Sequence, residues 1–353
     1  MRLSYSLGSL LTIEQVLDCA KILGKYSPDV VWIPETWGME NFSMLSMVSQ
    51  SVSSKIGSSI INVYSRSPTL VAMGAATIDT ISNGRLILGL GTSSEPIVKD
   101  WHGQEFEQPV SRLKEYIEII RLVLSRKKVE FNGKFFSLKN FSLLITPPRK
   151  HIPIYLAAIN QKMIELTWQT ADGVIFYLRP ISELKEIVEK MQKKRRIDIT
   201  CQIITCMSDD SEKAKIRAKK TLAFYISVGK IYRDFLSKNG FQKETANIFD
   251  EYKKSELGHS HRHARGGSFC GRGRQSQRRD CCYAGRAQAE RGEDPERMRG
   301  IRGSVYRSSN FHDAAGVELL AATALAGFFP LSQSGVTFTL PFQEPGGCTF
   351  SVW

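Results

Sequence analysis

The stretch SRSPTLVAMGAATIDTISNGRLILGLGT, residues 65–92, decides the fold of this chain. Ser67 precedes Pro68, and a capping residue followed by proline at the first helical position is typical of a helix start. The helical pattern ends at SNG (82–84), where asparagine and glycine favour a helix stop. RLILGLGT (85–92) follows at once as an apolar strand, so the stretch predicts one helix–strand unit of an α/β fold.

Apolar strands alternate with amphipathic helices on both sides of this stretch. Strands are predicted over residues 3–8, 30–35, 55–64, 85–92, 152–158, 173–177 and 198–207. Helices are predicted over residues 12–24, 43–53, 68–84, 111–126, 160–170, 182–196 and 211–227, with a hairpin over 129–138. Nearly all-apolar strands in strict β–α order predict a parallel sheet covered by helices on both faces. We therefore expect residues 1–227 to form seven units of a TIM-type (β/α)8 barrel, with a doubly wound open sheet as the alternative.

The glycine-rich end of the strand at 85–92 lies where both barrels and open sheets bind their ligands. Gly91 and Thr92 are therefore candidate ligand-binding residues, because a glycine lets a flat ring approach the backbone. The G-x-G-x-x-G dinucleotide fingerprint needs a glycine where this chain has Ser94, and it needs a helix directly after the strand. The sequence therefore excludes a Rossmann-type dinucleotide site at this position.

The character of the sequence changes near residue 255. Residues 1–254 contain 24 Lys and 12 Arg against 26 acidic residues, whereas residues 255–353 contain no Lys, 12 Arg, 14 Gly and 4 Cys. We interpret residues 1–254 as the barrel and residues 255–353 as an aberrant tail, frameshifted or chimeric, that is disordered or poorly packed. A disordered Arg/Gly segment of the RNA-binding kind and a small separate domain are the other interpretations.

We expect the barrel to be incomplete, with its last β/α unit missing or replaced by the tail. A closed barrel needs an eighth apolar strand after residue 227, and arginine and glycine interrupt every window of residues 258–310. The first and seventh strands are therefore predicted to lack a partner, with few contacts between tail and barrel. The histidines and cysteines of the tail lack zinc-ligand spacing, so no metal site is predicted.

Charge and composition narrow the class of protein. The net charge is +13, but the lysines mostly fall on solvated helix faces such as KEIVEKMQKKRR (185–196), which argues against a nucleic-acid partner. An excess of positive charge also suits an anionic cofactor. Residues 1–18 lack the apolar core of a secretory signal, and the apolar stretch Ala314–Leu331 carries Glu318. We therefore expect a cytoplasmic protein without a membrane span.

Three segments carry a resemblance to a known family: SRSPTLVAMGAATIDTISNGRLILGLGTSSEPIVKDWHG (65–103), PVSRLKEYIEIIRLVL (109–124) and IPIYLAAINQKMIELTWQTADGVIF (152–176). Together they resemble the bacterial-luciferase-like monooxygenase superfamily, and within it the deazaflavin-dependent branch that includes methylenetetrahydromethanopterin reductase. The resemblance implies a barrel that binds the deazaflavin coenzyme F420, or FMN as the alternative, at the carboxyl ends of its strands. It also implies hydride transfer to or from the ring, for which no protein nucleophile is needed.

The resemblance implies particular site residues at the ends of the third and sixth strands. Ser59 and Ile60 stand where the family has a bulge with a non-prolyl cis peptide bond behind the flavin ring, and Asn62 is nearby. Tyr177, at the tip of GVIFY (173–177), is implied to line the same mouth.

Glu35 and Trp37 are the implied catalytic residues. Glu35 stands at the end of the second strand, where relatives carry an acid near the ring. Thr36 occupies the place of the histidine that often follows this acid, and Trp37 shapes the pocket. His102 lies in the long loop after the fourth strand, with substrate contact and loop stabilisation as alternative roles.

The end of the strand IPIYLAA and the start of the next helix are implied to bind the cofactor phosphate through backbone N–H groups. The N–H groups are those of Ile159, Asn160 and Gln161, with Lys162 able to help, and Ala157 and Ala158 before them are also implied to bind the cofactor. Relatives commonly have glycine at positions 159 and 160, where this chain has Ile and Asn.

We therefore predict an oxidoreductase that passes a hydride between a deazaflavin or FMN and a small organic substrate, and that forms a homodimer if its barrel is complete. One alternative is an inactive truncated barrel or binding protein whose Arg-rich tail contacts nucleic acid. Another is a phosphate-binding isomerase or aldolase barrel. That function needs a catalytic Lys or Glu at a strand end, and only Glu35 qualifies.

Overall fold

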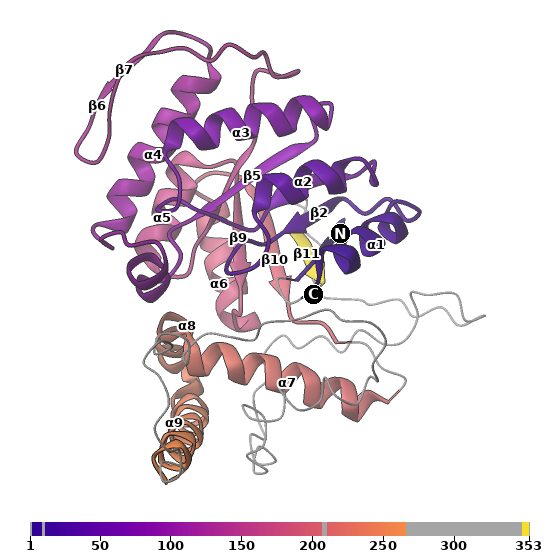
Figure 1. The fold of residues 1–353 in the computed structure, drawn as a ribbon, viewed down its shortest axis with the longest axis vertical. Helices are drawn as coiled ribbons and strands as arrows, with labels where there is room; N and C mark the ends of the chain where they lie inside the picture. Colours follow the sequence, from indigo (N-terminus) through magenta and orange to yellow (C-terminus); the bar gives the residue numbers. More distant parts are fainter. Residues whose placement is uncertain (1, 9–10, 207–209, 266–347, 353) are drawn as a thin grey trace, which may run out of the picture.

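The computed structural model describes residues 2–8, 11–206, 210–265 and 348–352, and it shows parallel strands surrounded by helices (Figure 1). The strands of the main sheet are β1 (Arg2–Ser6), β2 (Val30–Ile33), β3 (Lys55–Ser58), β4 (Ile61–Asn62), β5 (Leu86–Gly91), β8 (Ile154–Ala157), β9 (Gly173–Tyr177), β10 (Asp198–Ile203) and β11 (Cys348–Val352). A separate hairpin consists of β6 (Val129–Asn132) and β7 (Ser137–Phe141).

The described helices α1 to α7 each follow a strand of the main sheet, and α8 and α9 come directly after α7. They are α1 (Ile13–Leu23), α2 (Asn41–Ser49), α3 (Pro68–Ile81), α4 (Pro109–Leu124), α5 (Gln161–Thr170), α6 (Ile181–Gln192), α7 (Ser211–Val228), α8 (Lys230–Leu236) and α9 (Gln242–Arg265). Two π-helical turns, η1 (Ile97–Trp101) and η2 (Ser237–Phe241), precede α4 and α9. None of the helices in the described ranges is long and apolar enough to cross a membrane.

The strand pairings run all the way round the barrel. β1 pairs with β2, β2 with β3, and β3 with β5, and from β5 the order continues through β8 and β9 to β10. β11 lies between β10 and β1, with Thr349 opposite both Thr200 and Arg2. Every pairing in this ring is parallel, so the predicted TIM-type barrel is confirmed and the open-sheet alternative is wrong.

The eighth strand corrects the prediction that the first and seventh strands lack a partner. β11 pairs with both β1 and β10. The prediction relied on a continuous apolar run within residues 258–310, but CTFSV (348–352) alternates apolar and polar residues near the end of the chain. Main-chain hydrogen bonds hold a strand in a parallel ladder whatever its side chains, so an apolar run is not required.

The part of the tail next to the barrel is helical rather than loop-like. α9 continues without a break from Gln242 to Arg265 and so crosses the predicted domain boundary at residue 254. Residues 266–347, which include the apolar stretch 314–331, lie outside the described residues. The frameshift interpretation therefore stays a prediction for that segment.

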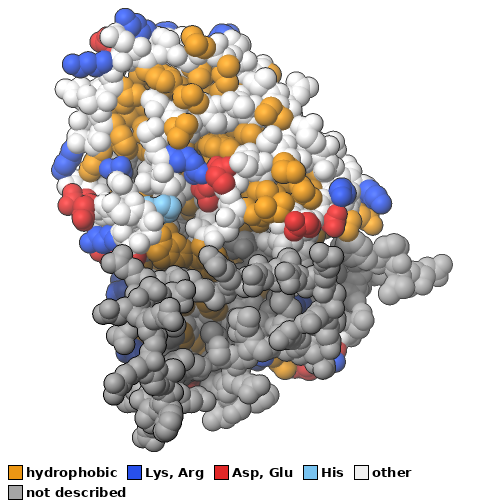
Figure 2. Space-filling view, in the orientation of Figure 1, with side chains coloured by type: hydrophobic (Ala, Val, Ile, Leu, Met, Phe, Trp, Pro, Cys, Tyr) orange, Lys and Arg blue, Asp and Glu red, His pale blue; other side chains and the backbone are white. Residues whose placement is uncertain are grey.

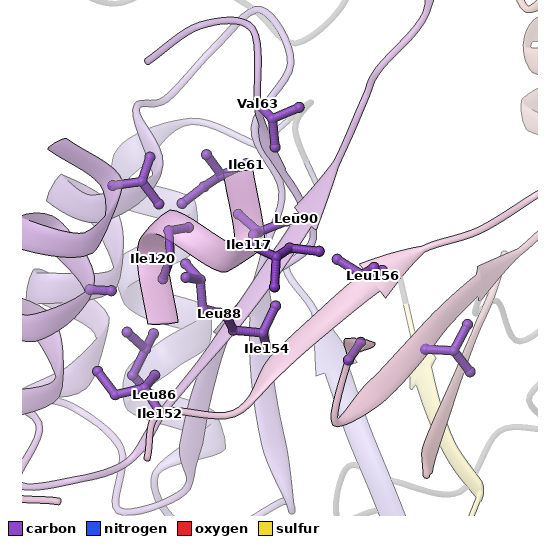
Figure 3. Packing of buried hydrophobic residues seen from close by; sticks show 14 of the residues in the cluster. Ile61, Val63, Leu86, Leu88, Leu90, Ile117, Ile120, Ile152, Ile154 and Leu156 are labelled. Carbon is purple, nitrogen blue, oxygen red and sulfur yellow. The ribbon is translucent and has the colours of Figure 1, made fainter. Parts of the chain in front are cut away.

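The largest hydrophobic core lies between the barrel strands and the helices outside them. Figure 3 shows Ile117 and Ile120 of α4 beside residues of the strands. The strand-side residues of this core that the figure labels include Leu86, Leu88, Leu90, Ile152, Ile154 and Leu156. Alternate residues point inside the barrel, where the rings of Trp32 and Tyr155 lie 5.9 Å apart in a second cluster. Side chains fill both the space between strands and helices and the inside of the barrel, so a ligand site is expected at the ends of the strands.

α3 packs on the sheet through its small residues. Ala72, Ala75 and Ala76 are fully buried, and their small side chains let the helix lie close to the strands. Gly74 serves a different contact, because a Cβ at this position would lie 2.5 Å from the ring of Phe42 in α2. The glycine therefore allows α2 and α3 to approach each other.

α7 lies across the end of the barrel toward which β10 points (Figure 1). Phe224 of α7 packs 6.4 Å from the ring of Trp37, which follows β2. The neighbouring Tyr225 packs 5.2 Å from Tyr177 at the end of β9. The carboxyl ends of at least two strands are therefore in contact with this helix.

Candidate active site

A cavity of about 290 Å³ opens at the carboxyl ends of β2, β4 and β5. Its lining consists of Glu35, Thr36, Trp37, Gly38, Met39, Glu40, Asn62, Ser65, Arg66, Ser93, Ile97 and His102. Three residues that the resemblance implied come together here: Glu35 and Trp37, which both follow β2, and Asn62 at the end of β4. The volume is close to the lower limit of small-molecule pockets.

Glu35 is held by an arginine that the sequence analysis did not single out. Nη1 and Nη2 of Arg66 donate to the two carboxylate oxygens of Glu35, at 2.8 and 2.5 Å. Nη2 also donates to Oε1 of Glu40 at 2.6 Å. The backbone N–H of Asn41 donates to Oε1 of Glu35 at 3.2 Å. Both oxygens of Glu35 therefore accept hydrogen bonds, and two carboxylates share one guanidinium.

The same contacts fix the ionisation of Arg66 and Glu40. The hydrogen bond to Glu35 raises the pKa of Arg66, so its guanidinium stays charged. Burial opposes the charge on Glu40, yet hydrogen bonds from Ser43 and Phe42 and the charge of Arg66 hold its pKa below the ordinary value. Glu40 caps the start of α2 by accepting from the N–H groups of these two residues, at 2.7 and 3.1 Å.

The peptide bond between Ser59 and Ile60 is cis, as the resemblance implied. It lies in the short bulge between β3 and β4, which both pair with β5. Oγ of Ser58 donates to the carbonyl of Gly89 at 2.8 Å and accepts from its N–H at 2.7 Å. The bulge is therefore tied to β5 by a side chain where the regular ladder is interrupted.

The glycines of GLGT make room for this bulge. A Cβ on Gly89 would lie 1.9 Å from the carbonyl oxygen of Ser58, and a Cβ on Gly91 would lie 2.8 Å from Cδ1 of Ile60. The side chain of Ile60 thus fills the space beside Gly91 in which we expected a flat ring. This corrects the reason given for the glycines, because protein atoms rather than a ligand require the missing side chains.

Two polar groups beside the bulge are buried and have no partner among the described residues. They are Oγ of Ser59 and Nδ2 of Asn62. Asn62 is 5% exposed, and its Oδ1 accepts from the N–H of Tyr64 at 3.0 Å, which leaves Nδ2 as the available donor. Buried polar groups in proteins are nearly always hydrogen-bonded. These two groups therefore fit a flat ligand ring that carries acceptor atoms at its edge.

Trp37 belongs to an aromatic cluster at the rim of the cavity. Its ring meets the ring of Trp101 edge to face at 5.6 Å and the ring of Phe224 at 6.4 Å. Trp37 and Trp101 remain 49% and 43% exposed. Figure 2 shows one face of the molecule, on which acidic and basic side chains lie side by side among hydrophobic ones. The position of Trp37 suits a residue that shapes the entrance.

The segment implied to bind a phosphate, residues 157–160, lies at the end of β8 and does not contribute to the lining of the cavity. Asn160 caps α5, and its Oδ1 accepts from the N–H of Met163 at 3.0 Å. The Cβ of Ala157 lies 3.3 Å from the place of a Cβ on Gly91, so the ends of β8 and β5 adjoin.

Arg179, directly after β9, is a buried residue that sequence reasoning missed. It is 1% exposed, and its guanidinium lies between the rings of Phe176 and Phe235, at 4.6 and 4.7 Å. It pairs with Glu183 and donates to the carbonyls of residues 158 and 159. A lone arginine after an apolar strand carries no sequence signal, because its partners come from segments far apart in the chain.

Tyr177 is the last residue of β9, and its ring packs against the helices that follow β10. Its ring lies 5.2 Å from Tyr225 and 5.8 Å from Tyr232. Burial raises the pKa of Tyr177 well above its ordinary value, so the phenol stays protonated at neutral pH. Tyr177 does not contribute to the lining of the cavity, whereas His102 does.

The fold and the site define an α/β-barrel protein with a ligand cavity at the carboxyl ends of its strands. Residues 2–277 match the model of the luciferase-like monooxygenase family, and the chain belongs to this family. The resemblance of its motifs is thereby confirmed.

Relatives and solved structures agree with this assignment. A protein of Mycobacterium tuberculosis, provisionally assigned as a coenzyme F420-dependent oxidoreductase, is 36% identical over 164 residues, 42% of this chain and 47% of that protein. This chain thus spans about half the length of that relative. The 5,10-methylenetetrahydromethanopterin reductase of Archaeoglobus fulgidus is 28% identical over 233 residues, 63% of this chain and 69% of that protein.

The structure of the coenzyme F420-dependent tetrahydromethanopterin reductase of Methanopyrus kandleri matches with a TM-score of 0.59 and 22% identity. The match covers 65% of this chain and 73% of that one. At this identity the likeness shows the shared fold alone.

Proposed function

We propose that this chain is an oxidoreductase that transfers a hydride between a bound deazaflavin coenzyme and a small organic substrate. Family membership and the names of the relatives support the reaction class. The observation that carries the proposal is the pair of buried donors without partners, Oγ of Ser59 and Nδ2 of Asn62, beside the bulge at the strand ends. A ring bound there would satisfy both donors.

The residues of the bulge have separate tasks in this proposal. A bound deazaflavin supplies the carbon that gives or accepts the hydride. Ser59 and Asn62 hold the polar edge of the ring, and Ile60 supports one of its faces. Ser58 keeps the bulge in place through its two hydrogen bonds to Gly89.

Glu35 acts as a positioning residue rather than as a proton donor. Both of its oxygens accept hydrogen bonds, from Arg66 and from the N–H of Asn41. These contacts join the end of β2 to the start of α2 and to the segment before α3. Trp37 reduces the access of water to the cavity through its contacts with Trp101 and Phe224.

The test is an equilibrium titration of the purified full-length chain with coenzyme F420 and, separately, with FMN. We expect the deazaflavin to bind at least about tenfold more tightly. Asn62→Ala removes one charge-neutral hydrogen bond to the ring, worth about 1 kcal/mol, and should raise the Kd for F420 about fivefold. Asn132→Ala, on the exposed hairpin between β6 and β7, is the matched control and should leave the Kd unchanged.

Two outcomes would overturn the proposal. Tight binding of FMN with none of F420 would make the chain a flavin enzyme of the same family. Binding of neither by the folded protein would favour the non-enzymatic alternative, a barrel whose function does not involve a flavin.

A further inference from the structure

The wall of the cavity carries an excess of negative charge. Glu35 and Glu40 both line it, and Arg66 is the one guanidinium among the lining residues. Arg66 is 14% exposed and donates to both carboxylates, at 2.5–2.8 Å. It therefore cannot turn toward a ligand anion without leaving two carboxylates uncompensated.

The loop after β5, which contributes Ser93, Ile97 and His102 to the lining of the cavity, is itself rich in acidic residues. The acidic residues between Ser93 and Glu107 are Glu95, Asp100, Glu105 and Glu107. Lys99 is the one lysine or arginine of that loop, and it already pairs with Glu95 at 3.1 Å and Glu105 at 3.8 Å; His102 of the same loop lines the cavity. The net charge of the whole chain is +13, so this excess of acidic over basic side chains is confined to the cavity wall and the adjoining loop.

The rim of the same cavity offers aromatic surface. Trp37 and Trp101 meet edge to face at 5.6 Å, and about half of each side chain is exposed. Phe224 contacts Trp37 from α7 at 6.4 Å. Exposed indole rings attract flat apolar groups, and their faces attract cations.

We propose that this entrance selects a substrate with a flat or apolar body and an uncharged or amine-bearing end over a substrate that ends in a carboxylate or a phosphate. The inference rests on the proposed function, since it names the substrate class of the same site. An acidic end would meet two carboxylates whose guanidinium is already engaged. An ammonium group would gain both from those carboxylates and from the indole rings.

The experiment uses three probes that share a phenyl ring and a two-carbon chain: 2-phenylethylamine, 2-phenylethanol and 3-phenylpropanoate. Binding to the full-length chain is measured by saturation-transfer NMR, with and without saturating F420. The amine is expected to bind about tenfold more tightly than the acid, with the alcohol in between. Equal binding of amine and acid, or tighter binding of the acid, would overturn the inference.

Variants separate charge from aromatic contact. Glu40→Gln retains an acceptor for the start of α2 and should reduce the preference for the amine about threefold, whereas Glu118→Gln on the exposed face of α4 should not change it. Trp37→Leu should weaken the alcohol and the acid about fivefold and the amine somewhat more, because the amine also loses a contact with the indole face. An unchanged ratio in Glu40→Gln would contradict the electrostatic part.

Failure of this inference is distinguishable from failure of the proposed function. The probe ratio is measured on the free chain as well as on the complex, whereas the proposed function depends on the F420 titration. A chain that binds F420 without preferring the amine refutes the substrate class alone. A chain that prefers the amine but does not bind F420 refutes the proposed function alone.

Discussion

Replacing Gly89 by alanine tests whether the glycines of β5 exist to accommodate the bulge. The new Cβ would lie 1.9 Å from the carbonyl oxygen of Ser58 and 3.0 Å from Cδ1 of Ile175. The first of these atoms belongs to the backbone and cannot rotate away. β3 and β5 must therefore separate by about 1 Å to restore an ordinary carbon–oxygen contact.

The cost follows from two contributions. Overpacking of this kind costs about 1–3 kcal/mol. Separation of the strands also weakens the two hydrogen bonds between Ser58 and Gly89, each worth about 1 kcal/mol. The sum, about 3–5 kcal/mol, corresponds to a fall in Tm of roughly 4–10 °C in a chain of 353 residues.

The measurement is thermal unfolding of the full-length variants by far-UV circular dichroism at one scan rate. Gly91→Ala is the matched control, because its Cβ would meet the flexible end of Ile60 at 2.8 Å and should lower Tm by only a few degrees. If Gly89→Ala unfolds within about 2 °C of the parent, the steric argument is wrong. Equal losses in both variants would also refute it.

Three further predictions concern charged groups. Arg66→Met leaves Glu35 without its partner in a site where both side chains are less than one-fifth exposed. The free energy of unfolding in urea should fall by about 2–3 kcal/mol, and by less in Arg66→Lys. An unchanged urea midpoint would contradict this. Burial opposes the charge of Asp172, but hydrogen bonds from the Ile154 N–H, Arg121 and His151 hold its pKa below the ordinary value. This stabilisation is present above the unfolded-state pKa and is lost as the pH falls through the lower folded-state pKa. In Asp172→Asn, Tm should therefore fall less steeply than in the parent as the pH drops below about 4. Arg179→Met should cost about 3–5 kcal/mol, because it breaks a buried ion pair and frees two carbonyls, and a surface-like loss below about 0.5 kcal/mol would refute that role.

Most of the barrel could be predicted from the sequence because its strands and helix starts have strong local signals. Thr12 and Gln15, three residues apart, form the capping box of α1 through bonds of 2.9 and 3.3 Å. Ser67 caps α3 by accepting from the N–H of Leu70, and Pro68 is the first residue of the helix. β11 gave no such signal. The strand has only five residues, and they alternate between apolar and polar. Its partners, β1 and β10, lie far away in the sequence.

The site could be predicted where strand ends decide it. Parallel strands in a barrel bring their carboxyl ends to one edge, and this is why Glu35 and Asn62 meet in one cavity. The hydrogen bonds from Arg66 to Glu35 and Glu40 and the burial of Arg179 could not be predicted, since each depends on contacts between distant segments. Tyr177 was expected to line an open mouth, but α7 and α8 pack against its ring.

The position at which the deazaflavin ring binds is the most direct test of the proposed function. A crystal structure of the full-length chain grown with coenzyme F420 would show where the deazaflavin lies. We expect the ring to lie against Ile60, with Nδ2 of Asn62 and Oγ of Ser59 each within about 3.2 Å of a ring acceptor. A ring bound away from the bulge, with both donors still unpartnered, would contradict the central claim.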